Sequence, residues 1–71
     1  MDKEYVYYCT ARPPMLGTVP TFGLLRVEAF PDRQYIHAID RMAWGKVAYQ
    51  QELTPAEVNA WELIMKPREG Q

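Results

Sequence analysis

The sequence has one cysteine, Cys9, and one histidine, His37. One cysteine excludes a disulfide within the chain, and the pair falls short of the four sulfur or imidazole ligands of a structural zinc site. A lone thiol is typical of a reducing compartment. No stretch approaches the roughly 18 consecutive apolar residues of a membrane span, and Met1-Asp2-Lys3-Glu4 lacks the start of a signal peptide. We therefore expect a cytoplasmic protein that does not bind membranes.

Motifs that carry chemistry are also missing. The glycines stand apart from one another, so there is no glycine-rich phosphate loop, and the carboxylates show no metal-ligand spacing. Cys9 and His37, with Asp40 to orient the imidazole, contain the residue types of a nucleophile and base, but no motif surrounds either. A cysteine within a strand usually serves as a small buried hydrophobe. We expect no enzymatic activity, no catalytic residue, no metal and no cofactor.

The chain also lacks a large excess of charge of either sign. The net charge is −1, which gives little attraction for polyanions. Five basic and three acidic residues lie between positions 12 and 46, and two basic and four acidic residues follow from position 50. The middle of the chain is therefore only slightly positive, which is ordinary scatter of surface charge.

The chain is rich in apolar and aromatic residues: 48% of its 71 residues are hydrophobic, including two Trp, five Tyr and two Phe. A domain of this size buries only about 60–65% of the surface that it exposes when unfolded, so large core side chains or dimerisation must make up its stability. We predict one globular domain over residues 1–71, with the aromatic side chains used mainly in its core.

The clearest local signal is Thr54-Pro55-Ala56-Glu57. Thr54 is a good N-cap, Pro55 suits the first helical position, and Glu57 completes a capping box three residues after the cap. Apolar side chains continue at helical spacing at Val58, Trp61, Ile64 and Met65. Because Pro67 cannot continue a helix, the pattern predicts a helix over residues 55–66.

Three segments have the composition of strands, namely residues 5–11, 24–30 and 43–51. Pro31-Asp32 is expected to end the second. Residues 33–42 allow either a short helix or an irregular edge strand, and the spacing of Tyr35, Ile39 and Ala43 slightly favours a helical turn. We predict an α+β fold in which a small antiparallel sheet of about three strands packs against one C-terminal α-helix.

Residues 12–23 contain three prolines and two glycines and predict a long loop. The loop is unusually apolar. Its side chains either fold back onto the core, the interpretation that we favour for Val19 and Phe22, or face a partner, an equal alternative for Met15 and Leu16.

From these features we predict a small non-enzymatic protein-binding or adaptor domain whose partner is another protein or a second copy of the chain. Its expected interaction surface consists of the loop and a sheet edge, with Arg12, Met15, Leu16, Val19, Arg41 and Trp44. The alternative is a single-stranded nucleic-acid-binding module that stacks bases on sheet aromatics beside arginines. Nucleic acid is the less favoured partner, because the chain lacks the high isoelectric point of such domains.

Overall fold

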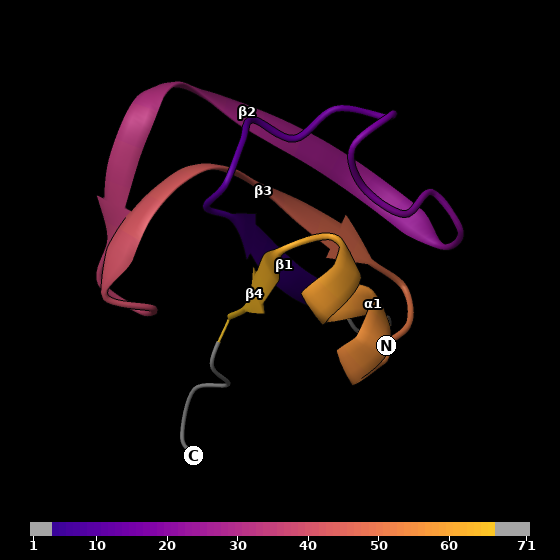
Figure 1. Ribbon diagram of the computed structural model, residues 1–71. Helices are drawn as coiled ribbons and strands as arrows, with labels where there is room; N and C mark the ends of the chain where they lie inside the picture. Colours follow the sequence, from indigo (N-terminus) through magenta and orange to yellow (C-terminus); the bar gives the residue numbers. More distant parts are fainter. Residues whose placement is uncertain (1–3, 67–71) are drawn as a thin grey trace.

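The computed structural model describes residues 4–66, which form a four-stranded antiparallel sheet and one short helix (Figure 1). The elements are β1 (Tyr5–Cys9), β2 (Leu24–Ile36), β3 (Arg41–Tyr49), α1 (Pro55–Ala60) and β4 (Leu63–Met65). The strand order is β2-β3-β1-β4, so β1 pairs with β3 on one side and with β4 on the other. The expected α+β class is confirmed, with one strand more than the sequence pattern predicts.

Helix α1 begins as predicted and ends early. The Thr54 hydroxyl oxygen accepts a hydrogen bond from the Glu57 N–H at 3.1 Å, and the Thr54 N–H donates to the Glu57 carboxylate at 2.9 Å. The prediction that the helix extends to residue 66 is wrong. Glu62 adopts a left-handed conformation with φ 58°, which turns the chain so that Leu63–Met65 pair with β1. Pairing the open edge of a central strand outweighs the helical spacing of the apolar residues.

The helical turn favoured for residues 33–42 is wrong. β2 runs on to Ile36, and a turn over residues 37–40 leads into β3, where Ile36 pairs with Arg41. Pro31 does not end the strand, because it lies in an irregular stretch between Ala29 and Gln34 where β2 has more residues than its partner. Proline is tolerated at such bulges and on edge strands, where its missing N–H breaks no ladder bond.

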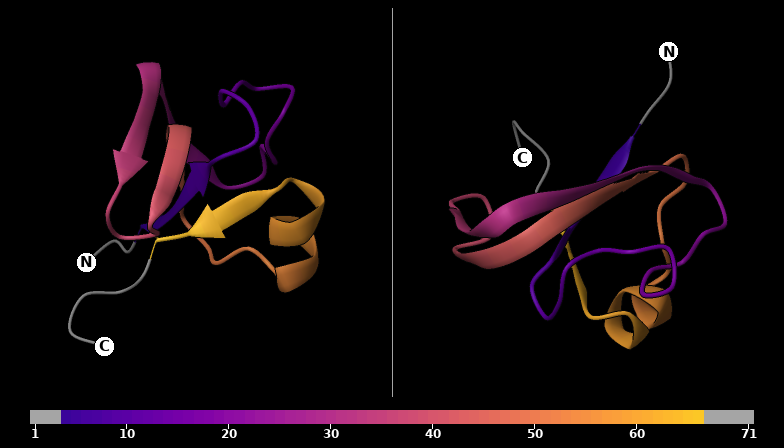
Figure 2. Two further views of the ribbon diagram at one scale, coloured as in Figure 1. Left: turned by 60° about the vertical axis from the view of Figure 1, so that its left-hand side comes forward. Right: turned by 90° about the horizontal axis from the view of Figure 1, so that it is seen from above.

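One face of the sheet carries the core. Alternate residues of β1, β3 and β4 point to the side that is covered by α1 and the loop over residues 12–23 (Figure 2). The core consists of Tyr7, Cys9, Val19, Val47, Tyr49, Leu53 and Leu63, with Val58 and Trp61 packed against it. The Tyr7 and Tyr49 rings are fully buried and meet edge to face with 5.9 Å between centroids. The aromatic residues therefore supply much of the core, as the composition predicts.

The two buried tyrosines also tie segments together through their hydroxyls. Tyr7 accepts a hydrogen bond from the Leu53 N–H at 2.9 Å, and Tyr49 donates one to the Pro20 carbonyl at 2.5 Å. Burial raises the pKa of Tyr7 and raises the pKa of Tyr49 to about 12. Both groups therefore stay neutral at physiological pH and hold the segment before α1 and the loop in place.

Candidate functional site

The loop over residues 12–23 is anchored to the core at several points. Val19 is only 2% exposed, which agrees with the core position that we favoured for it. Its place in the expected interaction surface is therefore wrong. Pro14 is buried against Gly45, where a Cβ would lie 2.6 Å from the proline ring. Together with the Tyr49–Pro20 hydrogen bond, these contacts give the loop a defined shape.

Three large apolar side chains of this loop face solvent. Met15 is 61% exposed, Leu16 is 70% exposed and Phe22 is 82% exposed. The core position that we favoured for Phe22 is wrong. Phe22 precedes Gly23, whose φ of 75° sets a turn. The Phe22 carbonyl accepts a hydrogen bond from the Gln51 side chain. The backbone is thus held in place while the ring points outward.

The first half of β2 adds two more exposed apolar side chains, Leu25 and Val27. We call Met15, Leu16, Phe22, Leu25 and Val27 the apolar surface. The expected interaction surface did not include Leu25 and Val27, because their alternation with Arg26 and Glu28 is the pattern of a half-buried strand. The remaining large exposed apolar residues of the described part, Tyr35 and Met42, lie on the far part of the β2–β3 hairpin.

β2 is an edge strand of the sheet, so its outer backbone groups have no ladder partner within the described residues 4–66. An unpaired edge is a template for another strand. Two irregularities interrupt its pairing with β3, one at Leu25 and one between Ala29 and Gln34. They leave a regular stretch from Arg26 to Ala29, the part of the edge that is suited to a further strand.

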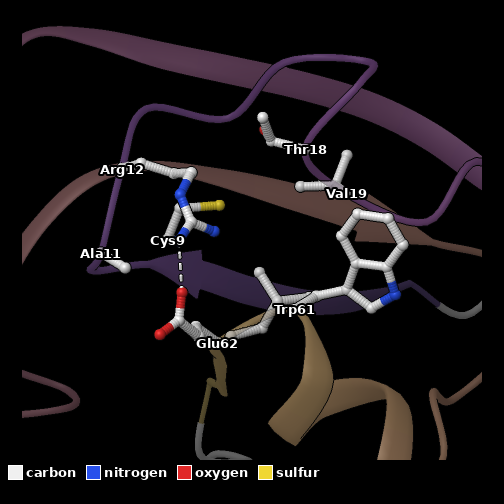
Figure 3. A pocket seen from close by; sticks show the side chains of 8 residues that line it. Cys9, Ala11, Arg12, Thr18, Val19, Trp61 and Glu62 are labelled. Atoms are coloured by element: carbon white, nitrogen blue, oxygen red, sulfur yellow. Dashed lines mark hydrogen bonds and ion pairs between the residues drawn. The ribbon is translucent and has the colours of Figure 1, made fainter.

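Arg12 lies at the start of the loop, and its contacts are with residues outside the apolar surface. Its guanidinium pairs with the Glu62 carboxylate at 2.5 Å, beside Cys9 and Trp61 (Figure 3). The hollow that these side chains line has a volume near 0 Å³, too small for a water molecule. Arg12 therefore fastens the loop to the turn after α1.

Arg41 and Trp44 lie on β3. Arg41 is exposed and lines an open depression together with Ala11 and Asn59. Trp44 is half-buried, and the Arg33 guanidinium carbon lies 5.5 Å from the centre of its ring. This cation–π contact occupies one face of the indole. The structure thus brings Met15 and Leu16 together in one loop and places Trp44 on another element.

The residue types of a catalytic site lie on separate elements. Cys9 is buried in β1, where burial raises the pKa of its thiol to about 11, so the thiolate is scarce at neutral pH. His37 lies in the β2–β3 turn with its ring against Tyr35. Within residues 4–66 no group of three or more His, Cys, Asp or Glu could hold a metal ion. No helix in that range is long and apolar enough to cross a membrane.

The sheet aromatics that base stacking would use are largely buried. Tyr7 and Tyr49 are fully buried and Tyr8 is 7% exposed. Two of the nearby cations face carboxylates: Arg26 pairs with Glu4 at 2.6 Å, and Lys46 lies 3.8 Å from Glu28. These positions leave little free aromatic surface beside free positive charge, the combination that base stacking and phosphate tracking require.

The chain is similar to known proteins at the level of a sequence family. No curated protein and no solved structure matches the chain. The model of the family described as Defence against restriction A C-terminal matches residues 2–68, which is nearly the whole sequence and the whole of the fold described above. This chain belongs to the Defence against restriction A C-terminal family.

Proposed function

We propose that this domain is a non-enzymatic protein-binding module of a defence-against-restriction protein, and that it binds through the apolar surface. The observation that carries the proposal is the exposure of five large apolar side chains on a backbone that the core holds in place. Groups of large apolar side chains exposed on one domain are typical of protein interaction sites.

The anchoring of the loop bears on affinity. Ordering a flexible loop on binding costs conformational entropy, at about 1–2 kcal/mol for each residue fixed. Here Val19, Pro14 and the Tyr49–Pro20 hydrogen bond fix the loop before a partner arrives. A preorganised surface therefore keeps more of the free energy gained from apolar burial. Met15 and Leu16 add adaptable contacts at an exposed part of the loop.

Charge favours a protein partner over nucleic acid. Arg26 and Lys46 are each paired with a glutamate of the same chain, and the whole sequence carries a net charge of −1. Affinity for a polyanion depends on free cations that release counterions on binding. Apolar contact needs no such cations, and it matches the groups that are exposed.

Site-specific photo-crosslinking in the cells that make the protein tests the proposal. A photoactivatable phenylalanine analogue replaces Phe22 in one variant and Ala38, in the β2–β3 turn, in a control variant. Both positions are exposed, but Ala38 lies outside the apolar surface. We expect a protein adduct at position 22, either with another protein or with a second copy of the chain, and none at position 38. No adduct at position 22, or equal adducts at both, would contradict the proposal.

The apolar surface must also be dispensable for folding. The double substitution Met15→Ser and Leu16→Ser removes two side chains that are 61% and 70% exposed. Exposed substitutions of this kind usually change stability by less than about 0.5 kcal/mol. The melting temperature should therefore stay nearly unchanged. A large fall would show that these residues belong to the core and would remove them from the interaction surface.

A further inference from the structure

The regular part of the β2 edge is self-complementary in charge. Arg26 and Glu28 lie two residues apart and therefore point to the same face of the strand, whereas Val27 between them points to the other face. The opposite charges lie symmetrically on either side of Val27. An antiparallel strand with the same sequence, placed so that Val27 faces Val27, would set each arginine opposite a glutamate.

We propose that the protein partner is a second copy of this chain, joined by antiparallel pairing of the two β2 strands about a two-fold axis at Val27. This inference rests on the proposed function and names its partner. Arg26 of one copy faces Glu28 of the other twice per interface. The residues needed on both sides are the same, as a two-fold interface requires.

The intrachain ion pairs extend this complementarity. Arg26 already contacts Glu4 at 2.6 Å, and Glu28 lies 3.8 Å from Lys46. Across the two-fold axis the side chains would follow in the order Lys46, Glu28, then Arg26 and Glu4 of the second copy. The charges alternate along this row, so each added neighbour is of opposite sign. Opposite charges on facing strands stabilise a sheet, and like charges destabilise it.

The other face of the joined strands is apolar. Val27 is 36% exposed on the side that carries the core, and the loop with Met15 and Leu16 lies on this side of the sheet (Figure 2). Pairing two copies would place Val27 beside its counterpart and bury both. The contact therefore combines main-chain hydrogen bonds, apolar burial on one face and alternating charge on the other.

The irregularities of β2 limit the pairing to this stretch. The bulge at Leu25 and the irregular stretch with Pro31 flank Arg26–Ala29. Bulges and prolines on an edge oppose open-ended strand addition. Because a two-fold contact uses this part of the edge in both copies, the assembly closes at two chains and does not grow into a fibre.

Exchange of the two charges tests the register. Arg26→Glu puts glutamate opposite glutamate, and Glu28→Arg puts arginine opposite arginine. In an equimolar mixture of the two variants every facing pair is again opposite in charge. In sedimentation equilibrium we expect the unmodified chain to dimerise, each variant alone to dissociate at least about ten-fold more readily, and the mixture to recover the dimer. Glu4→Gln, which removes an intrachain partner of Arg26 and leaves the facing pairs intact, serves as the control and should keep the dimer.

A thiol at the two-fold position gives a measurement that does not depend on charge. In Val27→Cys combined with Cys9→Ala, the two introduced cysteines would face each other at about 4.5–5.5 Å between Cα atoms, within the range for a disulfide. Mild oxidation should join them readily, whereas Leu25→Cys in the same background should react more slowly.

The outcomes separate this inference from the proposed function. An unmodified chain that stays monomeric would overturn the inference, and so would a dimer that the charge exchange leaves intact and that Val27→Cys does not crosslink. If a crosslink at Phe22 then captures a different protein, the proposed function stands and only the second copy is excluded.

Discussion

Replacing Tyr7 by phenylalanine removes a single hydroxyl from the centre of the domain. That hydroxyl accepts the Leu53 N–H at 2.9 Å, Tyr7 is fully buried, and Leu53 is 5% exposed. The ring and its contact with Tyr49 remain, so apolar packing changes little. A buried backbone N–H left without an acceptor costs about 1–3 kcal/mol. For a domain of this size each kcal/mol lowers the melting temperature by about 4–8 °C.

Tyr8→Phe is the matched control, because Tyr8 is the next residue on the same strand and points to the opposite face. Tyr8 is 7% exposed, and no hydrogen bond joins its hydroxyl to another residue of the described range. No buried side-chain polar atom in that range lacks a partner, so the Tyr8 hydroxyl is not a buried group that needs one. We expect this substitution to cost less than about 0.5 kcal/mol. Urea unfolding followed by circular dichroism measures both variants. Equal losses for the two substitutions, or a loss below about 0.5 kcal/mol for Tyr7→Phe, would refute the assigned role of the Leu53 hydrogen bond.

Three further predictions concern stability. In Gly45→Ala the new methyl would lie 2.4 Å from the Glu28 carbonyl oxygen and 2.6 Å from the Pro14 ring. The chain must therefore shift, and the free energy of unfolding should fall by about 1–3 kcal/mol. An unchanged midpoint of urea unfolding would contradict this contact. Thr54→Ala removes one half of the capping box and should cost about 1 kcal/mol, while Thr54→Ser should restore most of it. The Cys9 thiol has a folded pKa of about 11 against 9.0 for an ordinary thiol, so the unfolded chain loses its proton first and stability should fall by about 2 kcal/mol as the pH rises from 9 to 11. The same titration of Cys9→Ala should lack this fall.

Local signals in the sequence predicted the elements that depend on local contacts. The capping box fixed the start of α1, because its donors and acceptors are three residues apart. The three strands were found from alternation and β-forming residues. Val19 was assigned to the core from its apolar character, and it is 2% exposed.

The errors arose where a distant segment decides the local structure. Ile64 and Met65 have helical spacing with Val58, but the open edge of β1 draws them into β4. Residues 33–42 gave a weak helical signal, but hairpin pairing with β3 gives them a strand and a turn. Both decisions depend on hydrogen bonds to segments that are far away in the sequence or across a turn, and no window of neighbouring residues contains that information.

Only part of the candidate site was predicted, because the exposure of its other residues also depends on distant segments. Met15 and Leu16 were named from composition, whereas the exposure of Leu25 and Val27 depends on how far the elements that cover the sheet extend over β2. The helix and loop cover the core side of β1 and β3, but Leu25 and Val27 on the edge strand β2 remain exposed. Strand order in the sheet therefore determines which apolar residues meet solvent, and alternation along a strand does not reveal strand order.

The central place of β1 has a consequence for how the domain is made. Tyr7 pairs with Val47 on one side and with Met65 on the other, so the domain's first strand to leave the ribosome waits for two partners encoded much later. Closing such long loops slows folding relative to proteins with mostly local contacts. The nascent domain therefore completes its sheet only after Met65 has been released from the exit tunnel, and a chain cut before Leu63 would leave the inner strand half paired.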